Sequence, residues 1–318
     1  MIVGIIGRGF GLRVVAPAFE QTEGCKVVDV VSPRDDEAVA ALCARKDVDL
    51  VSVHSPPFLH LEHVRKAVEG GHAVLCDKPF GRDADEASAM CELAREAGPI
   101  NLLNFEMRFD PVLERFRQLV CDGAVGKTER ALYTSYLSVT RVPLRPHGWL
   151  FDAALGGGWL GAWGSHVVDF IRWTFGEITA ASADLETRIV ERPDAGGALH
   201  RCSAEDGFTA RLRTNKDVDV TIESTSTAPL NLPPRTLVVG SEGALEVAGR
   251  TITKYDGSGA HEVVEGGEGG GDLALPMRRW AAVVRDAVTS GAAHGDMPTF
   301  SDGLACREVL DRLRGSWV

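Results

Sequence analysis

The sequence has too few basic residues to offer a surface to nucleic acid. Its 318 residues include 34 Lys and Arg against 45 Asp and Glu, which gives a formal net charge of −11 without any basic run. Nucleic acid and anionic membranes attract clusters of positive charge. We therefore expect neither of them as a partner.

Paired cysteines and long apolar segments are also missing. The seven cysteines are scattered, and no two have CxxC spacing, which argues against disulfides or a zinc site and favours a reducing cytosol. No apolar run approaches the length of about 18 residues that indicates a membrane span. The apolar start at residues 1–6 is too short for a signal peptide and meets Gly7-Arg8-Gly9 instead of a cleavage site. These features predict a cytoplasmic protein.

The N-terminal part of the chain alternates short apolar strands with helices. Strands are predicted at residues 2–6, 27–31, 49–54, 73–76 and 100–104, and helices at residues 12–22, 35–45, 60–69 and 84–97. This alternation predicts βαβ units and a parallel, Rossmann-type sheet. The segment 32–48 is too short for another strand with its own crossover helix, so this sheet should lack one crossover unit.

The remaining chain has an α+β pattern. Helices are predicted at 110–122, from a Gly- and Trp-rich stretch at 156–164 to about residue 175, and at 274–290 and 301–315. Strands separated by turn residues, which predict a mostly antiparallel sheet, lie at 130–140, 180–190, 207–213, 217–225, 235–239, 244–247 and 251–255. We therefore predict a dinucleotide-binding domain at 1–106 and a second, α+β domain at 107–318.

The turn after the first predicted strand has glycines at Gly7, Gly9 and Gly11. Glycines let backbone N–H groups approach a pyrophosphate at the positive end of the following helix. Leu12 occupies the third glycine position of GxGxxG, so we expect the turn to be re-registered or the helix to stand slightly apart from the strand. We predict dinucleotide binding at Gly7, Gly9, Phe10, Gly11 and Leu12; the alternative is a tight turn without a ligand.

The second predicted strand ends in Ser32-Pro33-Arg34, without the acid that usually binds the ribose 2′-hydroxyl. A carboxylate would repel a 2′-phosphate, whereas a hydroxyl and a guanidinium suit it. We predict NADP as the cofactor, with NAD as the other possibility. The alternative is that Ser32-Pro33 is an ordinary turn and Arg34 a surface residue.

The strand predicted at 73–76 ends in Asp77-Lys78-Pro79. Open α/β sheets bind ligands at the carboxyl ends of their strands, where this charge pair would lie. Pro79 biases Lys78 towards an extended backbone, which would aim its amine in one direction. The alternative is a solvated loop lysine.

Several segments, in order, resemble the Gfo/Idh/MocA oxidoreductases, the family of glucose–fructose oxidoreductase and inositol dehydrogenase. The similar segments are the turn at 3–9, the stretch 47–60, Asp77-Lys78-Pro79, Arg108-Phe109-Asp110-Pro111, the glycine-rich segment and helix at 156–169, and residues 299–304. The resemblance implies hydride transfer between a nicotinamide and a hydroxyl or carbonyl carbon of a sugar, cyclitol or related molecule. It also implies that residues 107–318 bind the substrate and form a large open sheet that pairs subunits into a homodimer or homotetramer.

The resemblance also indicates site residues. Alcohol oxidation requires a base and a cation that holds the oxygen; His166, with an unperturbed pKa of about 6.5, would be the base and Lys78 the cation. Further cofactor contacts are predicted at Ser55, Pro56, His60, Asp77 and Lys78. Substrate contacts are predicted at Arg108, Trp149, Trp163, His166 and Asp169. For Arg108 the alternative is an ion pair at the domain junction, and for His166 a structural role on its helix.

Three departures from the family pattern matter here. Asp77 replaces the usual Glu, which is a minor change, and the segment after Arg34 is shortened. Ala162 stands where an aspartate usually precedes the histidine by four residues; Asp169, three residues after His166, would replace it in part. Ala162 and the shortened segment together keep other functions open. A catalytically impaired dinucleotide-binding sensor is therefore one alternative, and a redox-assisted glycosidase that retains its cofactor is another. Neither GxSxG nor HExxH occurs, and the histidines have no metal-site spacing, so we predict no metal.

Overall fold

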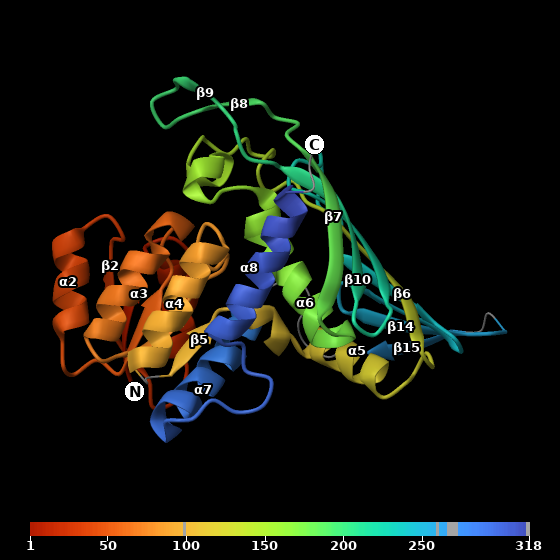
Figure 1. The fold of residues 1–318 in the computed structure, drawn as a ribbon, viewed down its shortest axis with the longest axis horizontal. Helices are drawn as coiled ribbons and strands as arrows, with labels where there is room; N and C mark the ends of the chain where they lie inside the picture. The colour runs from red at the N-terminus through yellow and green to blue at the C-terminus, as the bar shows by residue number, and fades with distance from the viewer. Residues whose placement is uncertain (98–99, 259–260, 266–272, 316–318) are drawn as a thin grey trace. The chain divides into compact units, whose positions relative to one another are not determined.

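The computed structural model describes residues 1–97, 100–258, 261–265 and 273–315 (Figure 1). Most of the acidic, glycine-rich stretch 265–272 lies outside the described residues. The chain forms two compact units: Met1–Phe109 with Leu273–Glu308, and Asp110–Asp272 with Val309–Val318. The division of tasks between residues 1–106 and 107–318 stays a prediction.

The described residues of the first unit contain a five-stranded parallel sheet of order β2-β1-β3-β4-β5. The strands are β1 (Ile2–Ile6), β2 (Lys26–Val31), β3 (Leu50–Val53), β4 (Ala73–Cys76) and β5 (Asn101–Leu103). Every residue of β3 and β4 is buried, as expected for central parallel strands covered on both faces. The predicted Rossmann-type sheet is confirmed. It ends at β2, because the segment 32–48 supplies only helix α2 (Asp36–Ala44).

Helices cover this sheet in two groups (Figure 1). Helix α3 (His60–Glu69) packs against α2 and α4 (Ala84–Ala97), while α7 (Ala274–Ser290) packs against α1 (Ala16–Glu20). The core between α1, α7 and the strands is apolar and includes Phe19, Leu75 and the fully buried Trp280. Helix α8 (Phe300–Gly315) begins in the first unit and ends in the second.

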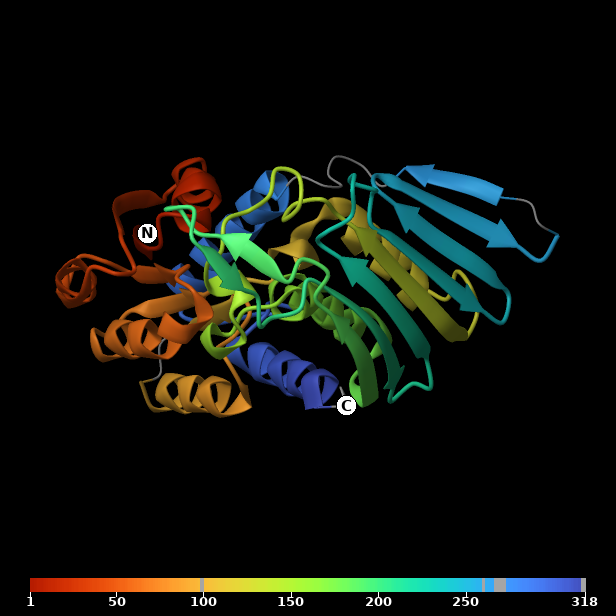
Figure 2. The ribbon, with the colours of Figure 1, turned by 90° about the horizontal axis from the view of Figure 1, so that it is seen from above.

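Within its described residues, the second unit contains an eight-stranded sheet of order β15-β14-β13-β12-β6-β11-β10-β7 (Figure 2). Neighbouring strands in this described sheet run antiparallel except β6 and β11, so the predicted mostly antiparallel sheet is confirmed. The strands are β6 (Thr128–Tyr136), β7 (Ile178–Glu186), β10 (Gly207–Thr214), β11 (Asp219–Thr225), β12 (Arg235–Gly240), β13 (Gly243–Ala248), β14 (Thr251–Asp256) and β15 (His261–Glu265).

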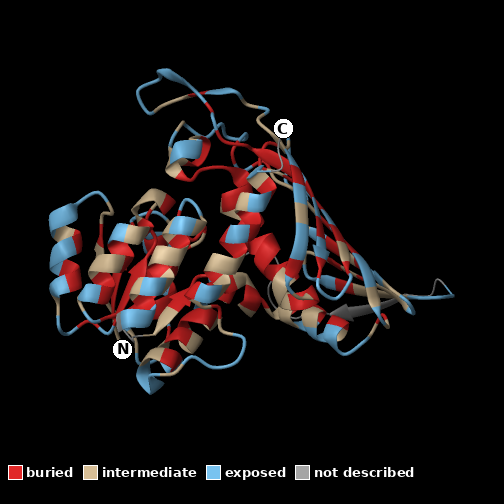
Figure 3. Ribbon diagram, in the orientation of Figure 1, coloured by how far each residue is buried: buried red, intermediate tan, exposed pale blue. Residues whose placement is uncertain are grey.

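One face of this sheet is covered by helices of the same unit. Helix α5 (Pro111–Cys121) contacts β13, β14 and α6 (Ser165–Phe175), and α6 is buried along most of its length (Figure 3). Residues of β10 alternate between buried and exposed, with Thr209 and Arg211 facing outward. This alternation is typical of an antiparallel sheet with one solvated face.

Strand β15 and two short strands elsewhere in this unit were not predicted from the sequence. Strands β8 (Glu191–Pro193) and β9 (Leu199–Arg201) form a separate ladder, and each is only three residues long. Arg192 of β8 is buried and donates hydrogen bonds to the carbonyl oxygens of Thr140 and Arg145. The backbone N–H of His147 also donates to the carbonyl oxygen of Pro193 at 2.7 Å. These contacts attach the ladder to distant segments, which strand patterning does not reveal. Among the described residues, no helix is both long and apolar enough to cross a bilayer.

Candidate functional site

The three glycines of the turn after β1 have different steric roles. A Cβ atom at Gly7, where φ is +139°, would overlap the carbonyl oxygen of His54. At Gly11 it would lie 2.9 Å from Cγ2 of Ile5, which is closer than real Cβ contacts come. At Gly9 it would meet no described heavy atom within 4 Å. Gly9 therefore leaves the open approach that a pyrophosphate needs, and Gly11 permits close packing of helix on strand.

The early position of Gly11 is accommodated by a π-helical turn. Residues Gly11–Val15 form this turn, which the backbone N–H of Ala16 closes onto the carbonyl oxygen of Gly11 before α1 continues. A π turn spans one more residue than an α turn. The predicted re-registration is confirmed, and Leu12 stays 46% exposed. The cradle fits a dinucleotide phosphate group.

The end of β2 presents cations. Arg34 is exposed, and its backbone N–H donates to Oγ of Ser32 at 3.3 Å. The Nε of Arg8 donates to the carbonyl oxygen of Val30 at 3.4 Å, which brings a second guanidinium to this strand end. Asp35 uses its carboxylate to cap α2, accepting from Ala38 N at 3.0 Å. Sequence reasoning missed Arg8, although its place between two glycines is a usable signal.

Ser55, Pro56 and His60 follow β3, as the sequence predicts. The Nε2 of His60 donates to the Ser55 carbonyl oxygen at 2.8 Å, and Nδ1 of His63 lies 2.9 Å from Ser55 Oγ. Burial lowers the pKa of His60, and burial followed by the charges of His60 and Lys66 lowers the pKa of His63 to about 4. Two neutral imidazoles thus brace the loop at Ser55.

Asp77 connects the ends of three strands. Its Oδ1 accepts from the backbone N–H of Lys78 at 3.0 Å and from Nδ2 of Asn104 at 3.2 Å, while Oδ2 lies 3.2 Å from Nδ1 of His54. Burial alone would raise the pKa of Asp77, but the charge and hydrogen bond of His54, then Lys78 and Asn104, hold it well below its usual range. Lys78 is half-buried and joined to Pro79 by a cis peptide bond.

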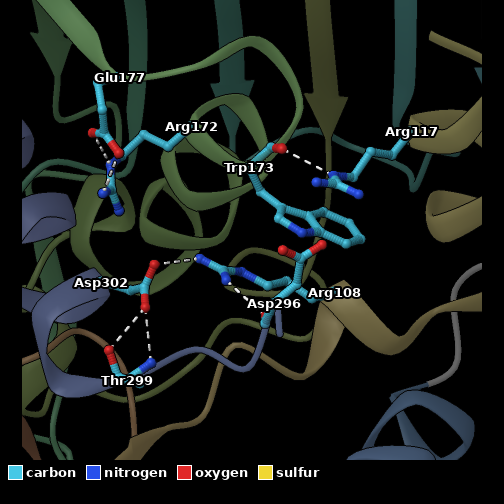
Figure 4. Close-up of polar contacts among 8 residues, drawn as sticks. All are labelled: Arg108, Arg117, Arg172, Trp173, Glu177, Asp296, Thr299 and Asp302. Carbon is cyan, nitrogen blue, oxygen red and sulfur yellow. Dashed lines mark hydrogen bonds and ion pairs between the residues drawn. The ribbon is translucent and has the colours of Figure 1, made fainter. Parts of the chain in front are cut away.

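Arg108 forms an ion pair at the first turn of α8 (Figure 4). Its Nη2 lies 2.9 Å from Oδ1 of Asp302, and its Nη1 donates to the carbonyl oxygen of Asp296 at 3.1 Å. The other oxygen of Asp302 accepts from Thr299 N and Oγ1, as in a capping box. Arg108 therefore has an ion-pair partner in Asp302, as the alternative interpretation of this residue expects. A substrate contact by Arg108 stays a prediction.

In the second unit, His166 lies buried in the first turn of α6, which continues a π-helical turn at Leu160–Gly164. The Oε1 of Glu205 accepts from Leu160 N at 3.1 Å and from Nη2 of Arg314 at 3.2 Å. Gly158 has a φ of +108°, and a Cβ atom there would overlap this carboxylate. Glu205 thus explains the third glycine of the run, Gly158. Sequence reasoning missed Glu205 because it lies far along the chain.

An aromatic stack supports His166 from its own helix. The ring centroids of Trp163 and His166 are 6.0 Å apart in an edge-on arrangement, and Trp163 stacks on Trp159 at 5.7 Å. The Nε1 of Trp163 donates to the hydroxyl of Tyr133 at 3.0 Å, and burial raises the pKa of Tyr133. The predicted substrate residue Trp163 therefore has a packing role beside the imidazole.

Ala162 borders an apolar cluster. Leu150, Phe151 and Cys202 are buried together, and Ala162 and Trp149 pack against them. Asp169 is buried on α6, three residues beyond His166. At the far end of α6, Arg172 pairs with Glu177 and Arg117 donates to the Trp173 carbonyl oxygen at 2.9 Å (Figure 4). The helix that carries His166 is therefore anchored at both ends.

Comparisons with known proteins agree with this arrangement. A model described as an oxidoreductase family with an NAD-binding Rossmann fold matches residues 1–105, and the GFO/IDH/MocA C-terminal domain model matches residues 113–246. D-xylose 1-dehydrogenase (NADP(+)) 2 of Haloferax volcanii is 30% identical over 243 residues, which cover 70% of this chain and 71% of that protein.

Two further similarities cover more of the chain. An uncharacterised oxidoreductase of Synechocystis is 29% identical over 273 residues, covering 80% of this chain and 73% of that protein. The structure of levoglucosan dehydrogenase in complex with NADH and levoglucosan is 21% identical, with a TM-score of 0.87 and coverage of 99% of this chain and 96% of that one. At this identity the structural likeness shows the fold.

Proposed function

The chain belongs to the Gfo/Idh/MocA oxidoreductases, and from this premise we propose that it transfers hydride between a nicotinamide cofactor and a hydroxyl or carbonyl carbon of a sugar or cyclitol. One observation supports this most directly. The glycine turn follows β1 and Asp77-Lys78 follows β4 of one parallel sheet, so both stand at its carboxyl edge. Ligands of open α/β sheets bind at that edge.

The cofactor would be held by backbone groups of the turn at Gly7, Gly9 and Gly11, with Phe10 and Leu12 beside them, and it supplies the hydride acceptor or donor. We favour NADP. Arg8 and Arg34 offer guanidinium groups at the end of β2, while the carboxylate of Asp35 is occupied as a helix cap. The similarity to a dehydrogenase named for NADP(+) supports the same choice.

In the proposed reaction, Lys78 and His166 act on the same substrate oxygen. Lys78 holds the oxygen as a cation, and His166 accepts the hydroxyl proton during oxidation or returns it during reduction, which contributes about 10²–10⁴-fold to the rate. Asp169 orients His166 from its own helix in place of the acid absent at Ala162. Trp149 and Trp163 supply apolar walls for the sugar ring, and Arg108 contacts the ligand at its edge.

Turnover of variants tests these roles. A panel of aldoses, anhydro sugars and cyclitols is assayed with NADP⁺ and NAD⁺ by absorbance at the nicotinamide band. We expect Lys78→Ala and His166→Ala to lower kcat by about 10²-fold or more and to leave NADPH affinity, measured by fluorescence, nearly unchanged. Arg45→Ala, which removes an exposed ion pair with Asp47, is the control variant. Full turnover in Lys78→Ala would remove Lys78 from the mechanism.

We further propose that the outward face of the eight-stranded sheet pairs subunits of a cytosolic homodimer or homotetramer. Leu132 is 42% and Val239 is 39% exposed. Leu132 pairs with Leu237 across β6 and β12, and Val239 with Arg130, so the three apolar side chains share that face. Light scattering of Leu132→Glu should show monomers where the unchanged protein forms dimers or tetramers.

A further inference from the structure

His54 lies where the order of the parallel sheet changes direction. It follows β3, which pairs with β1 on the side opposite β2, and such switch points are where ligands bind. Its side chain is completely buried. Nδ1 lies 3.2 Å from Oδ2 of Asp77, and Nε2 lies 2.7 Å from Oγ of Ser52. The hydrogen bond at Nε2 and the ion-pair contact at Nδ1 together fix the orientation of the buried ring.

The same residue also supports the glycine turn. The backbone N–H of His54 donates to the carbonyl oxygen of Ile6 at 2.7 Å, and its own carbonyl oxygen occupies the space beside Gly7. A Cβ atom at Gly11 would lie 3.3 Å from Cβ of His54, and the rings of Phe10 and His54 are 5.8 Å apart. One residue therefore touches both the phosphate turn and the acid that precedes Lys78.

The Ser52, His54 and Asp77 series is not a nucleophilic triad. Ser52 lies inside β3 and is fully buried, so its hydroxyl has no access to a substrate. A nucleophile must reach the reacting carbon, and this serine fixes a ring instead. Ser52, His54 and Asp77 therefore hold one another in position and do not attack a substrate.

We propose that His54 is a positioning residue for Lys78, acting through Asp77; the activity readout of this inference rests on the proposed function. Asp77 holds the backbone N–H of Lys78 with one oxygen and faces His54 with the other. Without the imidazole, a buried carboxylate loses a partner and turns or takes up a proton, which releases the lysine backbone. Misplacement of a catalytic group by about 1 Å lowers the rate by about 10²-fold.

Two substitutions separate the contacts of His54. In His54→Asn the side-chain amide nitrogen lies near the former position of Nδ1, so a donor still faces Asp77. In His54→Gln the longer side chain places its amide nitrogen near the former position of Nε2, so it reaches Ser52 and no donor faces the Asp77 carboxylate. We expect His54→Gln to lower kcat by about 10- to 100-fold with the KM for NADPH within about 3-fold, and His54→Asn to recover most of the loss. Ser52→Ala, which removes the other contact of the ring and leaves Asp77 beside Nδ1, should lower kcat less than His54→Gln does.

A second readout does not depend on turnover. Lysines are reductively methylated with ¹³C, and the Lys78 resonance is identified by its loss in Lys78→Arg. On addition of NADPH, the resonance should shift alike in the unchanged protein and in His54→Asn, and not in His54→Gln. If His54→Gln fails to fold, Asp77→Asn, which removes the same charge pairing, should reproduce its expected spectrum.

The outcomes distinguish the inference from the proposed function. The inference would be overturned if His54→Gln kept the kcat of the unchanged protein and its Lys78 resonance shifted with NADPH as in the unchanged protein. Equal losses of kcat in His54→Asn and His54→Gln would also overturn it. An unchanged protein that turns over no substrate would overturn the proposed function, and the NMR comparison would still decide whether His54 positions Lys78.

Discussion

Arg314 donates through Nη2 to Oε1 of Glu205 at 3.2 Å and to the carbonyl oxygen of Gly157 at 2.7 Å. The same carboxylate oxygen accepts from Leu160 N at the start of the helix that carries His166. A carboxylate at this end satisfies a free N–H group and opposes the helix dipole. The start of the His166 helix is thus fixed by two side chains far away in the sequence.

This clamp predicts that Gly158→Ala is destabilising. The position has a φ of +108°, and a methyl group there would overlap the Glu205 carboxylate. We expect the free energy of unfolding, measured by urea denaturation, to fall by about 2–4 kcal/mol. Gly148→Ala is the matched control, because Gly148 is extended and no described heavy atom lies within 4 Å of a Cβ atom there. Equal stabilities of the two variants would contradict the clamp.

The sequence correctly predicted those elements whose bounds are set by neighbouring residues in the chain. Strand β4 came out at residues 73–76 because an apolar run is bounded by Gly70-Gly71 and by Asp77-Lys78-Pro79. The π turn at Gly11–Val15 could be expected only as some re-registration, since its form depends on how closely the helix meets Ile5. Glu205 and His54 act through contacts between distant segments, so no local pattern identifies them.

The pair of Arg108 and Asp302 predicts a stability that depends on pH. Burial would raise the pKa of Asp302, but the charge of Arg108 and hydrogen bonds from Thr299 lower it overall. A depressed folded-state pKa stabilises the protein above the unfolded pKa of about 3.9, and this contribution disappears as pH falls through the folded-state value. Arg108→Met should therefore lower the free energy of unfolding by about 2–4 kcal/mol at pH 7.

The difference between Arg108→Met and the unchanged protein should shrink as urea titrations are moved below about pH 4. Arg45→Ala removes an exposed ion pair with Asp47 and serves as the control, with no expected change. A difference that stays constant down to acid pH would show that Arg108 contributes by packing alone.

His63 predicts a second dependence of stability on pH. Here the cause is burial of the imidazole rather than an ion pair. Its pKa is lowered to about 4, first by burial, so the folded state resists protonation more than the unfolded state does. The stability is therefore complete above the unfolded pKa of about 6.5 and is lost as pH falls towards 4, by about 3 kcal/mol in all. The variant His63→Gln can still form a hydrogen bond with Ser55 Oγ but has no titrating ring. It should therefore reduce the slope of the free energy of unfolding against pH, measured by denaturant titrations between pH 7.5 and 4.5. A slope equal to that of the unchanged protein would exclude His63 as its source.

The guanidinium groups of Arg8 and Arg34 lead to a prediction about cofactor choice. A 2′-phosphate carries about two negative charges, and each arginine within reach adds a charge-assisted contact that NADH lacks. We expect Arg34→Ala and Arg8→Ala each to weaken NADPH binding by about 10-fold and to leave NADH binding nearly unchanged, as measured by fluorescence titration.

Added salt should weaken the binding of NADPH more than that of NADH in the unchanged protein. In the double variant, salt should weaken the binding of both cofactors equally. Arg45→Ala, at the far end of α2, is the control for net charge. If the variants lose affinity for NADPH and NADH to the same extent, the strand end at Ser32 does not select a 2′-phosphate, and the preference for NADP has to be withdrawn.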